Sequence, residues 1–164
     1  MTINNLKDVY IDQLQDFHSA CKQSIRMTAQ LAETAKDRDL KSALIAGVTG
    51  IEDGMRAARN IVLSHGQNPS DEFCEGMEGL VKEAKAHGLD AEFSDDDAQD
   101  AMIITQYQRM VHYAIAGWGC TVAFAKRLGL DEDAAKLQEC LDRTYDGDRR
   151  MTEIAERRVN AAAA

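Results

Sequence analysis

The chain contains a single proline, Pro69, and no run in which β-branched residues alternate with polar ones. Alternation with a period of two is the pattern of a half-buried strand, so its absence predicts a protein without β-sheet. Helix-forming residues dominate the sequence instead. With 164 residues, the chain is long enough for one domain that buries a substantial core without disulfides or metals.

Positive charge is also scarce, because 19 basic residues stand against 28 acidic ones and give a net charge of −9. Nucleic acids and anionic membranes bind clustered basic surfaces, so we expect neither as a partner. The most apolar stretch, Tyr113 to Ala125, is too short for a membrane-spanning helix, which needs about 20 residues. This stretch therefore predicts a buried core helix.

The four cysteines, Cys21, Cys74, Cys120 and Cys140, form no Cys-x-x-Cys pair. The N-terminal segment has no basic region followed by an apolar run, so we expect a cytoplasmic protein with reduced thiols. Cys21, Cys120 and Cys140 fall at or near apolar helical positions, which predicts buried and unreactive thiols. We expect Cys74, which lies between the long helices, to be the most accessible of the four.

Apolar residues recur at helical spacing from Ile3 to Leu31, which predicts a first helix of roughly thirty residues. The charged turn at residues 36–39 separates this helix from a second one over residues 40–64. Gly66 follows the second helix and is expected to end it, because glycine adopts the left-handed conformation of a helix C-terminus.

A short helix is predicted over residues 71–86, where Ser70 would cap its start and Gly88 would stop it. The acidic cluster at residues 94–97 then begins the third long helix, since carboxylates stabilise the positive end of a helix dipole. This third helix is expected to run until Gly129 terminates it.

Asp131 is expected to cap a fourth long helix that continues towards Arg157. Two long helices, a short one and two further long ones predict an all-α, up-down four-helix bundle with one long crossover that carries the short fifth helix. This is the connection of ferritin-like bundles. We expect a single domain over residues 1–160, followed by a frayed alanine tail at residues 161–164.

Several separate segments carry a resemblance to one protein family. The segment Cys74-Glu75-Gly76-Met77-Glu78-Gly79-Leu80 is close to the family signature Cys-x-Ala-Met-Glu-Gly-Leu. The other matching segments are residues 6–10, 16–23, 112–113, 115–116 and 137–142. On these residues the chain resembles the YciE/YciF family of bacterial ferritin-like stress proteins. The resemblance implies a ferritin-like fold, a role in the stress response and a homodimer.

The chain departs from this family at the positions that the resemblance marks as ligands of a di-metal centre. Glutamate and histidine are replaced on all four long helices, at Cys21, Gly47, Gly50, Val111, Ala114, Arg143 and Thr144. A di-iron or di-manganese centre needs several carboxylate oxygens together with imidazole. The resemblance therefore implies a degenerate di-iron site, and we expect neither a metal nor another cofactor.

A few residues near these positions are candidates for an interior site. Tyr107 lies one turn before Val111 on the same helical face, and Trp118 lies one turn after Ala114, so both could line the interior. His112 is 100° round from Val111 and is expected at the edge of the site or against a neighbouring helix. Glu52 is expected to face solvent.

Gly54 continues the face of Gly47 and Gly50 along the second helix. Each glycine inside a helix costs about 1 kcal/mol relative to alanine. Either a closer approach of the helices or an internal cavity that a ligand fills would recover this cost.

The leading functional interpretation is a non-catalytic, metal-free, stress-associated protein that acts as a structural or interaction module. One alternative is a small-molecule binding protein that uses the glycine-lined interior. Another is an oxidoreductase with an unconventional mononuclear metal or thiol site built from Cys21, Tyr107 and His112. A homodimer is expected, because the third helix is apolar nearly all round and needs cover from a second subunit or from the crossover segment. The protein partner or small ligand stays open.

Overall fold

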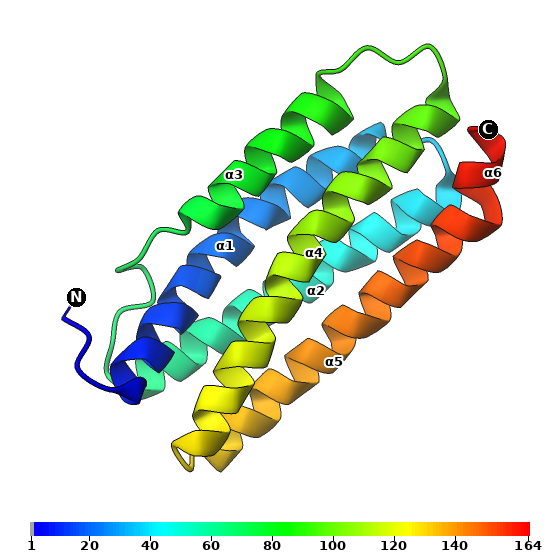
Figure 1. Cartoon of the computed structure of the whole chain (residues 1–164). Helices are drawn as coiled ribbons and strands as arrows, with labels where there is room; N and C mark the ends of the chain where they lie inside the picture. The colour runs from blue at the N-terminus through cyan, green and yellow to red at the C-terminus, as the bar shows by residue number, and fades with distance from the viewer. Residues whose placement is uncertain (1) are drawn as a thin grey trace.

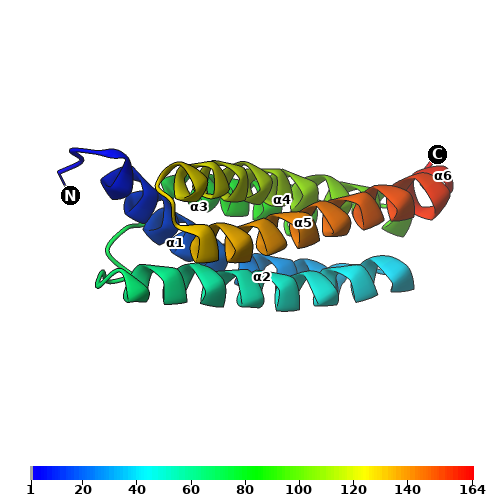
Figure 2. The same cartoon turned by 90° about the horizontal axis from the view of Figure 1, so that it is seen from below.

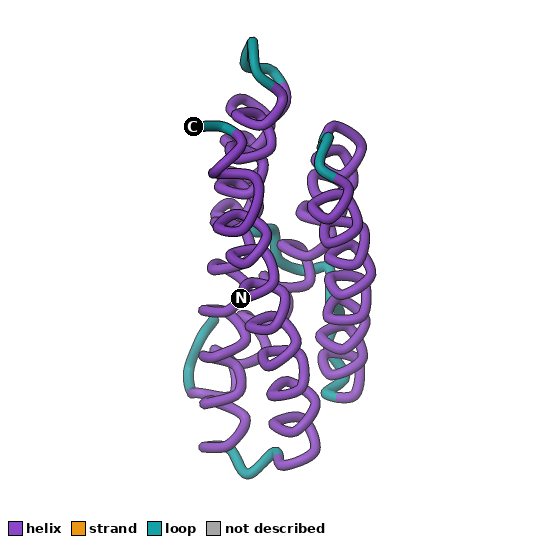
Figure 3. The backbone as a smooth tube through the Cα atoms, turned by 90° about the vertical axis from the view of Figure 1, so that its right-hand side faces the viewer, coloured by secondary structure: helices purple, strands orange, loops and turns teal. Residues whose placement is uncertain are grey.

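The computed structural model describes residues 2–164 as helices joined by short loops, without a β-strand among them (Figure 3). The long helices are α1 (Leu6–Thr34), α2 (Arg38–Ser64), α4 (Asp96–Arg127) and α5 (Asp131–Ile154). Met1, the first residue of the expected domain, lies outside the described residues. The predicted all-α fold is confirmed.

Helices α1 and α2 form one antiparallel hairpin, and α4 and α5 form a second one beside it (Figure 1). The crossover between them carries the short helix α3 (Glu75–Ala84), which lies along α1 and α4. This is the predicted up-down bundle with one long connection. Among residues 2–164, no helix is long and apolar enough to cross a membrane.

The ends of the long helices follow the local chemistry that the sequence indicated. The side chains of Asn5, Asp37 and Asp95 accept backbone N–H bonds at the starts of α1, α2 and α4. Gly66 and Gly129 adopt φ values of 72° and 69° just after α2 and α4. Only glycine takes this left-handed conformation without strain, so both helices end where they were predicted to end.

The short helix begins later than predicted, and Ser70 does not cap it. Its cap is Cys74, whose thiol accepts the N–H of Met77 at 3.3 Å. Side chains of α1 hold the backbone of Cys74: the hydroxyl of Ser19 accepts its N–H at 3.1 Å, and Gln23 donates to its carbonyl at 3.0 Å. Because these bonds fix the chain in an extended form before α3, the helix starts only at Glu75.

Two further boundaries differ from the expectation. Gly88 does not stop the short helix, which continues as the π-helical turn Lys85–Leu89, and Asp131 is the first residue of α5 rather than its cap. After α5, the π-helical turn Ala155–Val159 leads into the single helical turn α6 (Asn160–Ala162). Alanine has the highest helix propensity, which accounts for helix within the tail that was expected to fray.

Helix α3 covers the apolar face of α4 that prompted the expectation of a second subunit. Met77 of α3 is buried, and the ring of Tyr113 on α4 lies against Gly76, where an added Cβ would be 2.9 Å from the ring. The crossover therefore covers this face within one chain. The homodimer stays a prediction.

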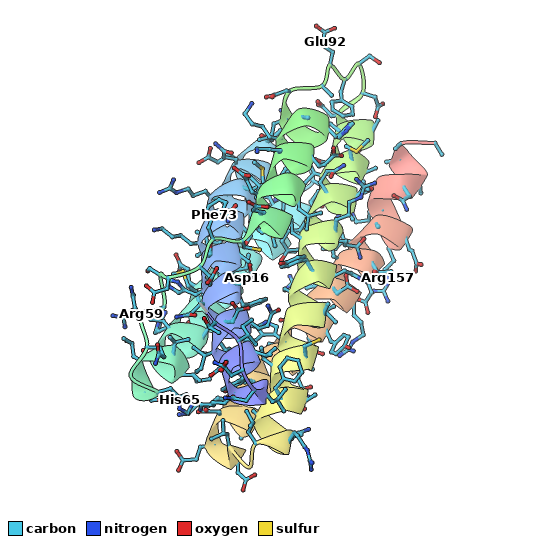
Figure 4. All side chains as sticks on the ribbon, turned by 60° about the vertical axis from the view of Figure 1, so that its left-hand side comes forward. Asp16, Arg59, His65, Phe73, Glu92 and Arg157 are labelled. Carbon is cyan, nitrogen blue, oxygen red and sulfur yellow. The ribbon has the colours of Figure 1, made fainter. Side chains whose placement is uncertain are left out.

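Two buried carboxylates join the hairpins at opposite ends of the bundle. At one end, Asp100 of α4 accepts the backbone N–H groups of Lys36 and Asp37 at 3.0 and 2.6 Å, in the turn between α1 and α2. At the other end, Asp133 of α5 accepts the Tyr10 hydroxyl at 3.1 Å and lies 2.7 Å from Nε2 of His65 (Figure 4). Each carboxylate thus satisfies groups from both hairpins.

We expect Asp100→Ala to lower the free energy of unfolding by about 3 kcal/mol, because two backbone N–H groups lose a charged acceptor. Urea denaturation followed by circular dichroism would measure the loss. Asp96→Ala is the matched control, since Asp96 is an exposed carboxylate in the first turn of the same helix, and it should cost below about 1 kcal/mol. Equal losses in both variants would contradict the structural role of Asp100.

Candidate functional site

A cavity of about 370 Å³ lies inside the bundle, between the four long helices. All seven positions that the resemblance marks as former metal-ligand positions line it: Cys21, Gly47, Gly50, Val111, Ala114, Arg143 and Thr144. The candidate residues Tyr107, Gly54 and Trp118 also line it. Apart from His112, the residues singled out from the sequence therefore surround one space, although they come from four separate helices.

The cavity is elongated along the bundle axis. Its lining spans residues 17–28 of α1, 43–54 of α2, 107–118 of α4 and 140–151 of α5. Each span rises by eleven residues, which corresponds to a length of about 16 Å at 1.5 Å per residue. Since neighbouring helices run in opposite directions, Phe17, Gly54 and Trp118 lie at one end, and Thr28 and Tyr107 lie at the other.

Aromatic rings close the first end, and the glycines beside them leave the space that these rings occupy. Phe17 and Trp118 are buried and pack with their ring centroids 4.0 Å apart. A Cβ on Gly54 would lie 2.9 Å from the Trp118 ring, and a Cβ on Gly117 would lie 2.7 Å from Phe17. These glycines thus allow close approach of side chains, which is one of the two roles that the sequence left open.

The second end carries the hydroxyl groups of Thr28 and Tyr107. Oγ1 of Thr28 is fully buried and has no hydrogen-bond partner among residues 2–164. The Tyr107 ring lies over Gly47, at a distance that leaves no room for a Cβ there. Burial is the main cause that raises the pKa of Tyr107 to about 12, so its hydroxyl stays protonated at neutral pH.

The cavity opens to solvent between α2 and α5, which lie side by side (Figure 2). Its lining residues on α1 are all buried, whereas Gly50 on α2 and Gly147 on α5 are exposed. A Cβ added at either glycine would meet nothing within 4 Å. Small residues thus leave a mouth on this side. The second role that the sequence left open for the glycines, an internal cavity, is also present.

Charged side chains lie at the rim of this mouth rather than inside it. Arg143 is exposed and forms ion pairs with Glu139 and Asp53, so it points outward. Arg150 lines the rim as well and is exposed, as is Asp146. The deep lining, in contrast, consists of apolar side chains, hydroxyls and thiols.

The two cysteines of the cavity are poor nucleophiles. Burial raises the pKa of the Cys21 thiol far above its usual range, and burial also raises the pKa of Cys140, which is half-buried. Only the thiolate attacks electrophiles or binds metals, so these groups are unreactive at neutral pH. The predicted burial is correct for Cys21.

Two expectations about the other cysteines were wrong. Cys120 is exposed, because its position on α4 faces away from the other helices. Cys74 is fully buried rather than accessible: its thiol lies 2.9 Å from the Tyr113 hydroxyl, which donates to Asp16 at 3.2 Å. Burial raises the pKa of Cys74, so the thiol stays protonated. Its contact with Tyr113 fastens the crossover to α4, and its backbone bonds to Ser19 and Gln23 fasten it to α1.

His112 does not line the cavity, so it is not an interior residue, and of its two expected placements the structure has the one against a neighbouring helix. Its side chain is 65% exposed, and Nε2 lies 3.2 Å from Oδ2 of Asp148 on α5. The rotation of 100° from Val111 carries the imidazole to the surface instead of to the edge of the interior. Cys21 and Tyr107 line the cavity without it, so the three residues do not form one site. Glu52 is exposed, as expected.

The cavity lining does not fit a di-metal centre. No group of three or more histidine, cysteine, aspartate or glutamate side chains within residues 2–164 is placed to hold a metal ion. Such a centre needs several carboxylates that project inward from the helices. Glycine, valine, alanine and threonine supply no such ligand.

Thr28 was missed in the sequence, although a signal for it was present. It lies seven residues after Cys21, which is two helical turns, so both side chains fall on one face of α1. The same spacing of seven relates Gly47 to Gly54 and Tyr107 to Ala114. A search at this spacing from the former ligand positions would have included Thr28.

The helix order, the single crossover and the interior site define a ferritin-like helical bundle protein. The chain belongs to the DUF892 family, described as a domain of unknown function, whose sequence model matches residues 5–164. It is 30% identical to protein YciF of Escherichia coli K12 over 164 residues, which cover 99% of this chain and 98% of that protein. The resemblance found in the sequence is thereby confirmed.

Solved structures are similar along nearly the whole chain. The crystal structure of the E. coli stress protein YciF matches with a TM-score of 0.89 and 29% identity, and the match covers 96% of this chain and 99% of that one. YcfI from Rhodopseudomonas palustris, described as a candidate structural protein, matches with a TM-score of 0.85 and 26% identity over 92% of this chain and 94% of that one. The ferritin-like fold is therefore shared.

We expect Thr28→Val to raise the free energy of unfolding by about 1 kcal/mol, because a buried unpaired hydroxyl carries a desolvation penalty. Thr121→Val is the matched control: Thr121 is equally buried, but its hydroxyl donates to the carbonyls of Gly117 and Trp118 at 3.0 and 3.1 Å. The control should lower stability. Urea denaturation would measure both, and a loss of stability in Thr28→Val would show that its hydroxyl is satisfied.

We also expect protein produced in iron- and manganese-replete medium to contain no stoichiometric metal, because the cavity offers no set of inward carboxylates. Elemental analysis of the purified protein would measure the content, and the melting temperature should be the same with and without EDTA. Two equivalents of transition metal for each chain would contradict this expectation, as would a melting temperature that falls by many degrees in EDTA.

Proposed function

We propose that this protein binds a small, largely apolar molecule inside its bundle and performs no catalysis of its own. The observation that carries the proposal is the cavity of about 370 Å³ at the centre of the fold. Ligand sites are typically concave, mostly apolar and about 300–1,000 Å³ in volume. Of the interpretations that the sequence left open, the cavity favours the small-molecule binding protein over the structural module.

The packing of ordinary protein interiors supports this choice. Cores are packed as densely as organic crystals, and voids larger than a water molecule are few. An empty apolar cavity lowers stability in proportion to its volume, because the lining atoms lose their contacts. A bound apolar molecule would restore those contacts, so the cavity is better explained as a site than as a packing defect.

Two of the open helical glycines lie at the mouth of the cavity. Glycine inside a helix lowers stability by about 1 kcal/mol relative to alanine. Gly47, Gly54 and Gly117 accommodate aromatic side chains, which accounts for them by packing. Gly50 and Gly147 contact nothing that an added Cβ would reach, and the same holds for Gly79 and Gly119, which do not line the cavity. Gly50 and Gly147 support access to the cavity because they are exposed and also line it.

The chemistry of the lining supports a non-catalytic role. The thiols of Cys21 and Cys140 have raised pKa values, and the residues present do not fit a di-metal centre. The E. coli relative is called a stress protein, and we extend this association to the present protein as part of the proposal. The homodimer and the cytoplasmic location also remain proposals.

Trp118 offers a direct test, because it is the only tryptophan of the chain and lines the cavity. We expect butylbenzene, a small apolar probe, to change the Trp118 fluorescence in a saturable way and to raise the melting temperature. A ligand that binds only the folded state stabilises it by mass action. Native mass spectrometry of the purified protein would show whether a molecule is retained from the cell.

Ala114→Leu should weaken butylbenzene binding at least tenfold, because the larger side chain fills the cavity that Ala114 lines. Fluorescence titration would measure the change. Ala116→Leu is the matched control, since Ala116 is exposed on the same helix and does not line the cavity. It should bind the probe as the unchanged protein does. Equal binding by both variants would place the probe outside the cavity and contradict the proposal.

A further inference from the structure

We propose that the second end of the cavity, where Thr28 and Tyr107 lie, is a hydrogen-bonding subsite formed by the hydroxyls of these two residues. The inference rests on the proposed function and specifies its ligand class. The ligand is an uncharged molecule with an apolar body and one oxygen-bearing end, such as an aliphatic alcohol or a carbonyl compound. Its polar end lies towards α1 and α4, and its apolar body extends towards Trp118.

The hydroxyl of Thr28 behaves differently from those of most threonines in the helices. A helical threonine commonly donates to the carbonyl of the residue four positions earlier. Five threonines of this chain do so, with distances of 2.7–3.2 Å: Thr34, Thr105, Thr121, Thr144 and Thr152. Thr28 is fully buried and makes no such bond to Ser24. Its hydroxyl is therefore available to a molecule in the cavity that it lines.

Tyr107 supplies the second hydroxyl from the opposite helix. The side chain is only 5% exposed, and its hydroxyl reaches across to α2, directly over Gly47. Any residue larger than glycine at position 47 would collide with this hydroxyl. The tyrosine stays protonated at neutral pH because burial raises its pKa. It can therefore donate a hydrogen bond to a ligand oxygen, while the Thr28 hydroxyl can donate or accept.

The distribution of charged side chains disfavours a ligand whose group beside Thr28 and Tyr107 is ionised. The charged residues that line the cavity are Asp53, Arg143, Asp146 and Arg150, and all four come from α2 and α5 beside the mouth. No charged side chain of α1 or α4 lines the cavity. An ion without a counter-charge is strongly disfavoured in an apolar interior, whereas a neutral oxygen with a hydrogen bond is tolerated. The subsite therefore selects an uncharged polar group.

Three probes with the same apolar body separate the possibilities: butylbenzene, the terminal alcohol phenylbutanol and the carboxylate phenylbutyrate. Each is titrated against the full chain by Trp118 fluorescence. The variants are Thr28→Val and Tyr107→Phe, each of which removes one hydroxyl and keeps the shape of the side chain. We expect each variant to weaken phenylbutanol binding about five- to tenfold, which is the range of one net hydrogen bond. Butylbenzene binding should stay unchanged or become tighter.

Thr121→Val serves as the control for the loss of a buried hydroxyl elsewhere in the bundle, and it should leave the affinity for all three probes unchanged. A thermal melt of each variant confirms that it is folded before titration. The double variant should weaken phenylbutanol binding further and still bind butylbenzene. This pattern would assign the polar end of the ligand to the end of the cavity where Thr28 and Tyr107 lie.

Three other results would overturn the subsite. If butylbenzene binds and both hydroxyl variants bind phenylbutanol unchanged, the cavity is a ligand site without this subsite. If phenylbutyrate binds most tightly and only Arg150→Gln weakens it, the polar end lies at the rim and is anionic. If no probe binds the unchanged protein and no retained molecule is found, the proposed function itself fails, and the subsite fails with it.

Discussion

The two buried carboxylates at opposite ends of the bundle are the constraint on which the rest of the structure depends. Asp100 holds the turn between α1 and α2 against α4, and Asp133 holds the start of α1 and the end of α2 against α5. The hairpins are thus fixed to each other at both ends by charge-assisted bonds. The middle of the bundle does not have to supply these contacts, and it contains the cavity.

The middle of the bundle has small or apolar side chains at positions where the family resemblance implies large polar ones. At positions where the family resemblance implies carboxylates and imidazole, this chain has residues such as Gly50, Val111 and Ala114. The neighbouring aromatic side chains did not occupy all of the space, because Trp118 and Tyr107 pack onto Gly54 and Gly47 at the two ends. We infer that the cavity is the volume that the former ligands and their ions would fill.

Much of the fold was predictable because its signals are local. Apolar spacing predicted the four long helices, and Gly66 and Gly129 predicted two of their ends from backbone conformation alone. The start of α3 was not predictable in this way, since Ser19 and Gln23, which are distant in sequence, fix the backbone at Cys74. The same reason explains why Cys74 was wrongly expected to be accessible: its burial depends on Tyr113 and on the path of the crossover, which are not local signals.

For the candidate site, the sequence identified which positions face the interior but not whether they enclose space. Helical periodicity placed Val111, Ala114 and Trp118 on one face, and the structure has them there. Periodicity gives an angle on a single helix, however, and His112 at 100° from Val111 could equally face a neighbour or solvent. Whether Gly50 packs against another helix or opens a mouth depends on the distance between α2 and α5, which no single helix encodes.

The mouth itself has a consequence for the speed of exchange. Gly50 and Gly147 add no side chain to its edge, and the charged side chains at the rim, such as Arg143 and Arg150, are exposed and can change rotamer without moving a helix. Interiors sealed by large side chains release their contents only when packed helices separate, and such collective motions take microseconds to milliseconds. Here the two hairpins can stay joined through Asp100 and Asp133 at both ends of the bundle during exchange. For the ligand that we propose, such a mouth favours rapid exchange over long retention.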